Sequence, residues 1–255
     1  MRAILAAAGM LALLAMSPAL AGPAAEAFAA GRWAEAAALG SRGTTAEERI
    51  AEARALSAIA TWETKDKETA RAQLERAVAA AEAAVALDPA NNRALLERAI
   101  VVGYLGKLKG SAGNAKASRR DAEDVLRRDP DNALAEAILG GWHVETVATV
   151  GAFLARTAVG ARAADGVRHF ERALKLDPGS VLYPVFYAFG LLALDAKNAP
   201  RAAELLVLAS RNRPADAYER QVQARGRQVL ELLQKGQPQA GAAVARRLSP
   251  LGQIG

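Results

Sequence analysis

Apolar and small residues recur along this chain at every third or fourth position, and Pro, Gly, Asn and Asp interrupt the runs. This period predicts amphipathic helices, and the interrupting residues mark their ends. β-branched and aromatic residues are comparatively few, so the pattern predicts an all-α fold. The expected helices are 24–30, 33–39, 46–61, 68–87, 93–107, 116–128, 133–154, 161–176, 182–196, 200–212, 217–235 and 240–248.

Four proline-containing turns occur in matching contexts, at Pro89, Pro130, Pro178 and Pro214. Each proline closes a helical run, because proline cannot continue a helix and disfavours it in the preceding residue. An Asn, Ser or Asp follows two or three residues later and can cap the next helix. Each site therefore predicts a helix, a tight turn and a second helix.

The residues before these prolines share a second pattern. Gly166, Phe170 and Ala173 lie twelve, eight and five positions before Pro178, and small or apolar residues occupy the same positions elsewhere. This pattern resembles the second helix of a tetratricopeptide repeat, and Gly140 matches the Leu-Gly pair of the first helix. The resemblance covers about residues 70–235 and implies antiparallel helix pairs stacked into a superhelix.

Small residues are expected where the two helices of a repeat cross closely. The family offsets pair a small residue of each first helix with one of the second helix. The expected pairs are Ala99 with Ser118, Gly140 with Gly166, and Ala188 with Ala202.

The repeat spacing departs from the family. Successive prolines are 41, 48 and 36 residues apart, whereas a tetratricopeptide repeat has about 34 residues. In the first repeat we assign the excess to an irregular Gly- and Lys-rich stretch at 106–117. In the second we expect two lengthened helices with a turn near 157–160.

The N-terminus has the pattern of a secretory signal peptide. Arg2 precedes an apolar run at 3–16, and Ala19-Leu20-Ala21 is a small-x-small cleavage site. The run is too short to span a membrane, which takes about 20 apolar residues. We therefore expect cleavage after Ala21 and a periplasmic or secreted protein. The expected organisation is a signal peptide at 1–21, a repeat domain at 22–236, and a short helix with a flexible tail at 237–255.

Composition removes several function classes. The chain has no cysteine, so disulfides, thiol catalysis and cysteine metal sites are excluded. The net charge of +6 is small and scattered, so nucleic acid is not an expected partner. The apolar stretch 181–194 is short and holds Pro184, so we interpret it as a core helix, and no integral membrane span is expected.

A basic cluster has two interpretations. Lys107, Lys109, Lys116, Arg119 and Arg120 form either a solvated surface or a contact for an anionic lipid or acidic partner.

The motif search finds no catalytic constellation, phosphate-binding loop or cofactor motif, so we predict neither enzyme activity nor a cofactor. The two histidines, His143 and His169, fall in different helices. A metal site that includes Glu145 is not predicted, because residues two apart face different sides of a helix. His143 falls at a packing position of the repeat, and His169 is expected to be exposed.

The resemblance implies a concave groove lined by first helices, where partners bind. A peptide, a helix or an apolar ligand fits such a surface. The first hypothesis is therefore a periplasmic scaffold or adaptor that binds a protein or peptide. The alternative is a solute-binding accessory protein with an apolar small-molecule pocket within the stack. The groove residues expected to bind the partner are Arg93, Tyr104, Glu145, Phe189, Tyr218 and Arg225.

Overall fold

A computed structural model describes residues 22–254, and within that range the regular structure is helical, without strands. The expected all-α helical-repeat fold is confirmed. The expected signal peptide lies outside the described residues. In chain order the helices are α1 (Pro23–Ala29), α2 (Trp33–Gly40), α3 (Ala46–Trp62), α4 (Lys67–Leu87), α5 (Asn92–Lys109), α6 (Ala112–Arg128), α7 (Ala133–Val150), α8 (Ala152–Val159), α9 (Ala163–Leu176), α10 (Leu182–Leu194), the 3-10 helix η1 (Ala196–Asn198), α11 (Ala199–Arg211), α12 (Ala217–Gln234) and α13 (Pro238–Leu248).

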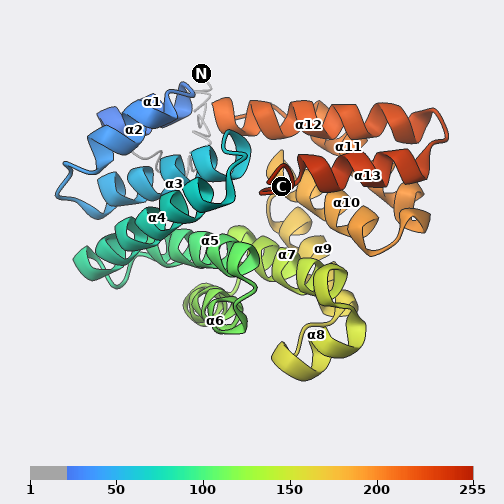
Figure 1. Ribbon diagram of the computed structural model, residues 1–255, viewed down its shortest axis with the longest axis horizontal. Coiled ribbons are helices and arrows are strands. Elements are labelled where there is room, and N and C mark those ends of the chain that lie inside the picture. Colours follow the sequence, from blue (N-terminus) through green and yellow to red (C-terminus); the bar gives the residue numbers. More distant parts are fainter. Residues whose placement is uncertain (1–21, 255) are drawn as a thin grey trace, which may run out of the picture.

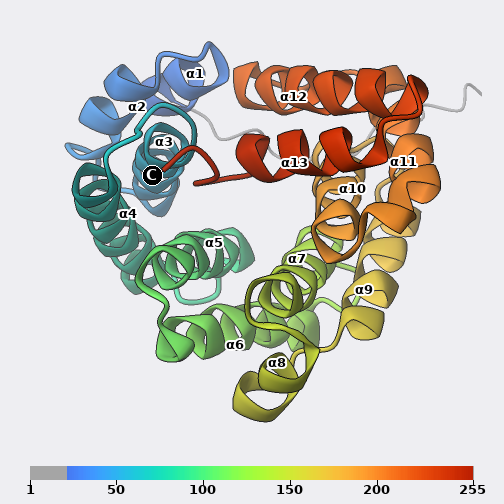
Figure 2. The ribbon, with the colours of Figure 1, turned by 45° about the vertical axis from the view of Figure 1, so that its right-hand side comes forward.

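The helices follow one another around a ring (Figures 1 and 2). Helices α3, α5, α7 and α10 form its inner layer, and α4, α6, α9 and α11 lie outside them (Figure 2). The two ends of the ring meet through aromatic side chains. The Tyr218 ring of α12 lies 6.1 Å from that of Phe28 in α1 and 6.3 Å from that of Trp33 in α2. We call the surface of α3, α5, α7, α10 and α12 that lines the interior the inner face.

The turns form as their sequence predicts. The Asn91 side chain accepts hydrogen bonds from the backbone N–H groups at the start of α5. Asn132 and Asp216 cap α7 and α12 in the same way. The Ser180 hydroxyl accepts from the first two N–H groups of α10. Each cap satisfies donors that a helix N-terminus leaves unpaired.

The close crossing of α7 and α9 also agrees with the sequence. A Cβ added to Gly166 would lie 2.9 Å from the Gly140 carbonyl oxygen and 2.6 Å from Val144 Cγ2. In the preceding pair, the Ser118 hydroxyl donates to the Ala99 carbonyl at 2.7 Å. Small residues therefore bring these helices together.

The glycine- and lysine-rich stretch 106–117 is helical, contrary to expectation. Helix α5 continues to Lys109 and α6 starts at Ala112, so only two residues separate them. Gly110 has a left-handed φ of 65° that ends α5, and the Ser111 hydroxyl caps α6. Gly106 fits inside α5 because this helix packs closely against Asn114 of α6, and Gly113 lies in the first turn of α6.

The expected long helix 133–154 is divided. Helix α7 ends at Val150, and Gly151 with φ 82° changes the chain direction before α8. A second left-handed glycine, Gly160 with φ 78°, separates α8 from α9. Both φ values are ones that glycine adopts at little cost. The excess residues of this repeat therefore build an extra short helix.

The residues after α13 pack against the ring, although a flexible tail is expected from the sequence. Leu251 is only 7% exposed, and its N–H donates to the Thr61 carbonyl of α3 at 3.3 Å. We call residues 249–254 the C-terminal segment. The stretch 181–194 forms the buried helix α10, and no helix within 22–254 has both the length and the apolar character to cross a membrane.

Candidate functional site

Three of the predicted groove residues come together on the inner face. Tyr104 of α5 lies beside Tyr218 of α12. The guanidinium carbon of Arg225 lies 4.1 Å from the centroid of the Trp62 ring, which is itself 6.2 Å from the Tyr218 ring. Burial raises the pKa of Tyr104 well above its usual value and that of Tyr218 to about 12. Both hydroxyls therefore keep their protons and can donate hydrogen bonds.

Arg93, a fourth predicted residue, belongs to the same region. Burial and the neighbouring Arg54 lower the pKa of Arg93. Glu97, one turn further along α5, is 7% exposed, and burial raises its carboxyl pKa to about 7 against the pull of the two arginines. Arg54 makes an ion pair with Asp216 at 3.6 Å. A charged and aromatic group thus joins α3, α5 and α12.

This group contains more hydrogen-bond donors than acceptors. The indole N–H groups of Trp33 and Trp62 are buried without an acceptor. The Trp62 N–H is near the Tyr218 hydroxyl but outside hydrogen-bonding geometry. Arg93 and Arg225 form no ion pair with any residue in 22–254. A buried donor without a partner is unusual in a native fold. We call this region the interior cluster: Trp33, Arg54, Trp62, Arg93, Glu97, Tyr104, Tyr218 and Arg225.

Glu145 lies next to the C-terminal segment. The Lys107 ammonium of α5 pairs with Glu145 of α7 at 2.8 Å. The same ammonium donates to the Pro250 carbonyl at 3.3 Å. Glu145 also lies near enough to Tyr104 to contribute to its raised pKa. This predicted residue therefore orients the lysine that holds the segment.

Apolar contacts complete the docking of the C-terminal segment. Leu251 is buried with Leu74 of α4 and Leu105 of α5, and Ile254 packs against the same cluster. Tyr104 packs there too, so one side chain belongs both to this apolar pocket and to the interior cluster. The docked segment holds Leu251 at φ 66°, a conformation that costs a non-glycine residue about 1–2 kcal/mol.

Phe189, the sixth predicted residue, is not on the free surface. It is 4% exposed and belongs to the main core. Helix α13 packs against α10 on the inner side of the ring, so this part of the groove is covered by the chain itself (Figures 1 and 2). Phe189, predicted as a partner contact, is therefore part of the core and not accessible from the inner face.

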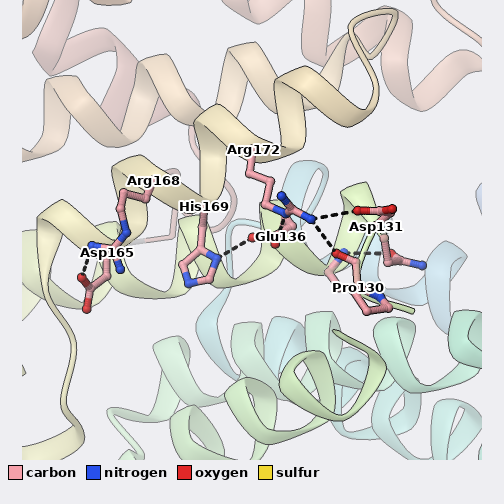
Figure 3. Close-up of polar contacts among 9 residues, drawn as sticks. Pro130, Asp131, Glu136, Asp165, Arg168, His169 and Arg172 are labelled. Atoms are coloured by element: carbon pink, nitrogen blue, oxygen red, sulfur yellow. Dashed lines mark hydrogen bonds and ion pairs between the residues drawn. The ribbon is translucent and has the colours of Figure 1, made fainter. Parts of the chain in front are cut away.

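The histidines form a second polar site between α7 and α9. His169, expected to be exposed, has Nδ1 at 2.5 Å from Glu136 Oε2 (Figure 3). Arg172 Nε binds the other Glu136 oxygen at 3.0 Å, and its guanidinium also reaches Asp131 at 2.8 Å (Figure 3). A buried carboxylate thus fixes two side chains of α9.

His143 is buried as expected and lies behind His169. The two rings are stacked with centroids 5.7 Å apart. His143 Nδ1 accepts the backbone N–H of Arg162 at 3.1 Å, and burial, with His169 adding to it, lowers the His143 pKa to about 4. Both histidines line an open cleft of about 650 Å³ between α6 and α9. Within residues 22–254 no three His, Asp or Glu side chains gather in a way that could hold a metal ion.

The partners of the groove residues in the interior cluster were not predicted. Glu97 is the one charged residue between Arg93 and Arg98 in an otherwise apolar run, and Trp33 and Trp62 are two of only three tryptophans. A charge inside an apolar helix and rare large aromatics are signals that could have identified them.

Comparison with known proteins gives a family and no individual relative. No curated protein matches the chain. A family model described as "Regulator of microtubule dynamics protein 1-3" matches residues 40–234, which include most of the interior cluster and all helices from α3 to α12. The chain therefore belongs to the RMD1-3 family, a helical family.

Proposed function

We propose that this protein is a binding module that holds a peptide segment of a protein partner on its inner face. The observation that carries the proposal is the docking of the C-terminal segment there. Leu251 and Ile254 enter an apolar pocket, and the main chain is held by Thr61 and Lys107. A surface that binds a short turn-forming piece of its own chain has contacts that a peptide from elsewhere would need.

The contacts define the chemistry of such a partner. Two apolar side chains three residues apart would take the places of Leu251 and Ile254. The adjoining interior cluster offers Arg93, Arg225 and two indole N–H groups without acceptors. A carboxylate or another acceptor group near the apolar anchors would satisfy these donors. The preferred ligand is therefore an apolar peptide with an acidic residue or a free carboxyl group nearby.

The proposed role as a periplasmic scaffold is supported by the sequence and by the family. The description of the RMD1-3 family names no chemical reaction, which is compatible with a binding protein. The proline turns and the small residues at the helix crossings support a tetratricopeptide-like superhelix. With the signal-peptide pattern at 1–21, we propose a periplasmic scaffold or adaptor.

A second candidate is a solute-binding protein. The buried indole N–H groups of Trp33 and Trp62 favour it, because a small ligand with acceptor atoms and an apolar body would satisfy them inside the ring. Such a ligand would bind the interior cluster and leave the C-terminal segment in place.

Displacement of the C-terminal segment tests the first candidate. We would replace Leu251 by Asp in the full chain, which should release the segment because a charge cannot stay in the pocket of Leu74 and Leu105. A fluorescent peptide with the sequence of residues 249–255 should then bind saturably in trans. A peptide with Ala at the positions of Leu251 and Ile254 should bind roughly tenfold more weakly or worse.

The control is Glu204→Ala, a change on the outer layer that leaves the segment docked, and this variant should not capture the peptide. Circular dichroism would verify that both variants are folded. Equal binding of the native and Ala peptides, or no binding by folded Leu251→Asp protein, would contradict the peptide-binding function. If the C-terminal segment stayed docked while the protein bound a small apolar carboxylate, the solute-binding function would be favoured.

A further inference from the structure

The chain exposes large apolar side chains at one place in particular. Within residues 22–254, five large hydrophobic side chains are exposed, and three of them lie in the stretch 150–154. Val150 is 46% exposed, Phe153 78% and Leu154 56%. An isolated exposed apolar residue is ordinary, but a contiguous group indicates an interaction site.

Helix α8 holds this group away from the rest of the molecule. It projects from the edge of the ring in both views (Figures 1 and 2). Gly151 and Gly160, both with positive φ, bound the helix, and Ala155 anchors its inner side in a cluster with Trp142. The Arg119 guanidinium of α6 also donates to the Val159 carbonyl at 3.3 Å. The helix is therefore tethered on one side and presents Phe153 and Leu154 on the other.

Cations predominate around α8. Residues 146–164 contain no Asp or Glu, and they include Arg156 and Arg162. Lys116 and Arg120 are exposed on the neighbouring helix α6. None of these four cations makes an ion pair with another residue of 22–254, whereas Arg119 beside them is paired with Glu123. The surface next to the apolar group is thus predominantly positive, although Asp165 lies near Arg162 and Glu123 is paired with Arg119.

A hollow lies beneath α8 beside two of the cations. It has a volume of about 370 Å³, and Arg156, Arg162, Val147 and four alanines line it. Its lining has no acidic side chain, so an anionic group that entered it would meet two guanidinium groups and no repulsion.

We propose that α8 is the site at which this protein contacts an anionic lipid surface. Phe153, Leu154 and Val150 enter the boundary between headgroups and acyl chains, and Arg156 and Arg162 bind lipid phosphates from the hollow. Apolar side chains flanked by unpaired cations are the combination that holds peripheral proteins on such membranes. Acidic protein surfaces would satisfy the cations but would leave Phe153 and Leu154 without a matching apolar environment. The Lys- and Arg-rich stretch of α6 is part of the same surface.

A site-specific probe tests the contact, because the chain has no cysteine of its own. Leu154→Cys would be labelled with an environment-sensitive fluorophore and mixed with vesicles in which about a third of the lipid is phosphatidylglycerol. We expect a blue shift and a rise in emission that disappear with phosphatidylcholine vesicles and at high ionic strength. Leu208→Cys on α11, also partly exposed, is the matched label and should not respond.

Two sets of variants separate the parts of the contact. With the label at Thr157→Cys, Phe153→Ser combined with Leu154→Ser should weaken vesicle binding roughly tenfold or more, because the buried apolar area is lost. Arg156→Gln with Arg162→Gln should weaken binding to anionic vesicles and reduce its salt dependence. An unchanged emission at position 154 with anionic vesicles would overturn the proposal, as would an equal response at position 208. These residues lie outside the interior cluster, so the result is independent of peptide binding.

Discussion

The ring of Phe170 in α9 fills the space beside Gly140 in α7. A Cβ on Gly140 would lie 2.8 Å from Phe170 Cγ and Cδ2, closer than real side chains approach. Gly141, the next residue, has its nearest Phe170 atom at 3.8 Å from the equivalent position. Two adjacent glycines of one helix therefore have opposite packing requirements.

The first prediction compares these glycines. Gly140→Ala should lower the free energy of unfolding by roughly 1–3 kcal/mol, because overpacking outweighs the better helix propensity of alanine. Gly141→Ala should leave stability unchanged or raise it by up to about 1 kcal/mol. Urea unfolding followed by circular dichroism would measure both. Similar unfolding midpoints for the two variants would show that the α7–α9 crossing is looser than described.

The sequence was informative where the deciding interactions are local. A proline followed by Asn, Ser or Asp determines where one helix stops and the next begins, and all four such turns are present. The contact of Gly140 with Gly166 was also predictable, because close helices need small residues at a crossing. The repeat offsets also placed Tyr104, Tyr218 and Arg225 along one groove, but their contact across the closed ring was not predicted.

What the sequence missed depends on contacts between distant parts of the chain. Phe189 is buried because α13 returns along the inner side of the ring. Leu251 is ordered because its pocket is built by α3, α4 and α5. The glycines of 106–117 were expected to interrupt helices, but two of the three lie inside α5 and α6. Periodicity contains no information on such long-range docking.

His143 should make the protein less stable in acid. The unfolded side chain takes up a proton near its ordinary pKa of 6.5, but the folded one does so only near 4. Between these values the unfolded state binds more protons than the folded state. The free energy of unfolding therefore decreases as the pH falls from about 6.5 to 4. The loss approaches about 3 kcal/mol.

The variant His143→Asn isolates this effect, because an amide oxygen can still accept the Arg162 N–H without titrating. The difference in unfolding free energy between wild type and His143→Asn should shift in favour of the variant between pH 7 and pH 4.5. Other titrating groups cancel in that difference. A constant difference across the range would show that His143 is not held neutral.

Glu97 should have the opposite sign of pH dependence. Its carboxyl pKa is about 7 in the folded protein and 4.5 ordinarily, so the folded state binds more protons between these values. The free energy of unfolding of the wild type therefore falls, compared with a variant that has a neutral side chain at this position, as the pH rises from about 4.5 to 7. Glu97→Gln should be closest to wild type near pH 4.5 and gain on the order of 2–3 kcal/mol relative to it by pH 8. Urea unfolding at the two pH values, with exposed Glu204→Gln as the control, would measure this.

The mass of the mature protein tests whether the chain is exported and cleaved. If residues 1–21 act as a signal peptide, protein recovered from the periplasm should have the mass of a chain that starts at Gly22 or within a few residues of it. Intact-mass spectrometry of the fractionated protein would decide this. Recovery of the uncleaved chain from the cytoplasm alone would remove the assignment of a periplasmic adaptor.

The interior cluster should provide the binding energy for the proposed partner. Tyr104→Ala, Tyr218→Ala and Arg225→Ala should each weaken peptide binding to the Leu251→Asp protein by about 1 kcal/mol or more, because aromatic and arginine side chains supply most interface energy. Tyr104 should have the largest effect, since it contacts both the apolar pocket and Tyr218.

Stability must be separated from binding in these variants. Tyr218 also packs against Phe28 and Trp33 where the two ends of the ring meet, so its loss should lower the unfolding midpoint as well. Tyr218→Phe keeps these contacts and removes only the hydroxyl, so it should bind weakly while it melts almost like wild type. Arg211→Ala, an exposed arginine on the outer layer, matches the charge change of Arg225→Ala and should bind normally. If Arg211→Ala and Arg225→Ala weakened binding equally, the effect would come from net charge, and the partner would not reach the interior cluster.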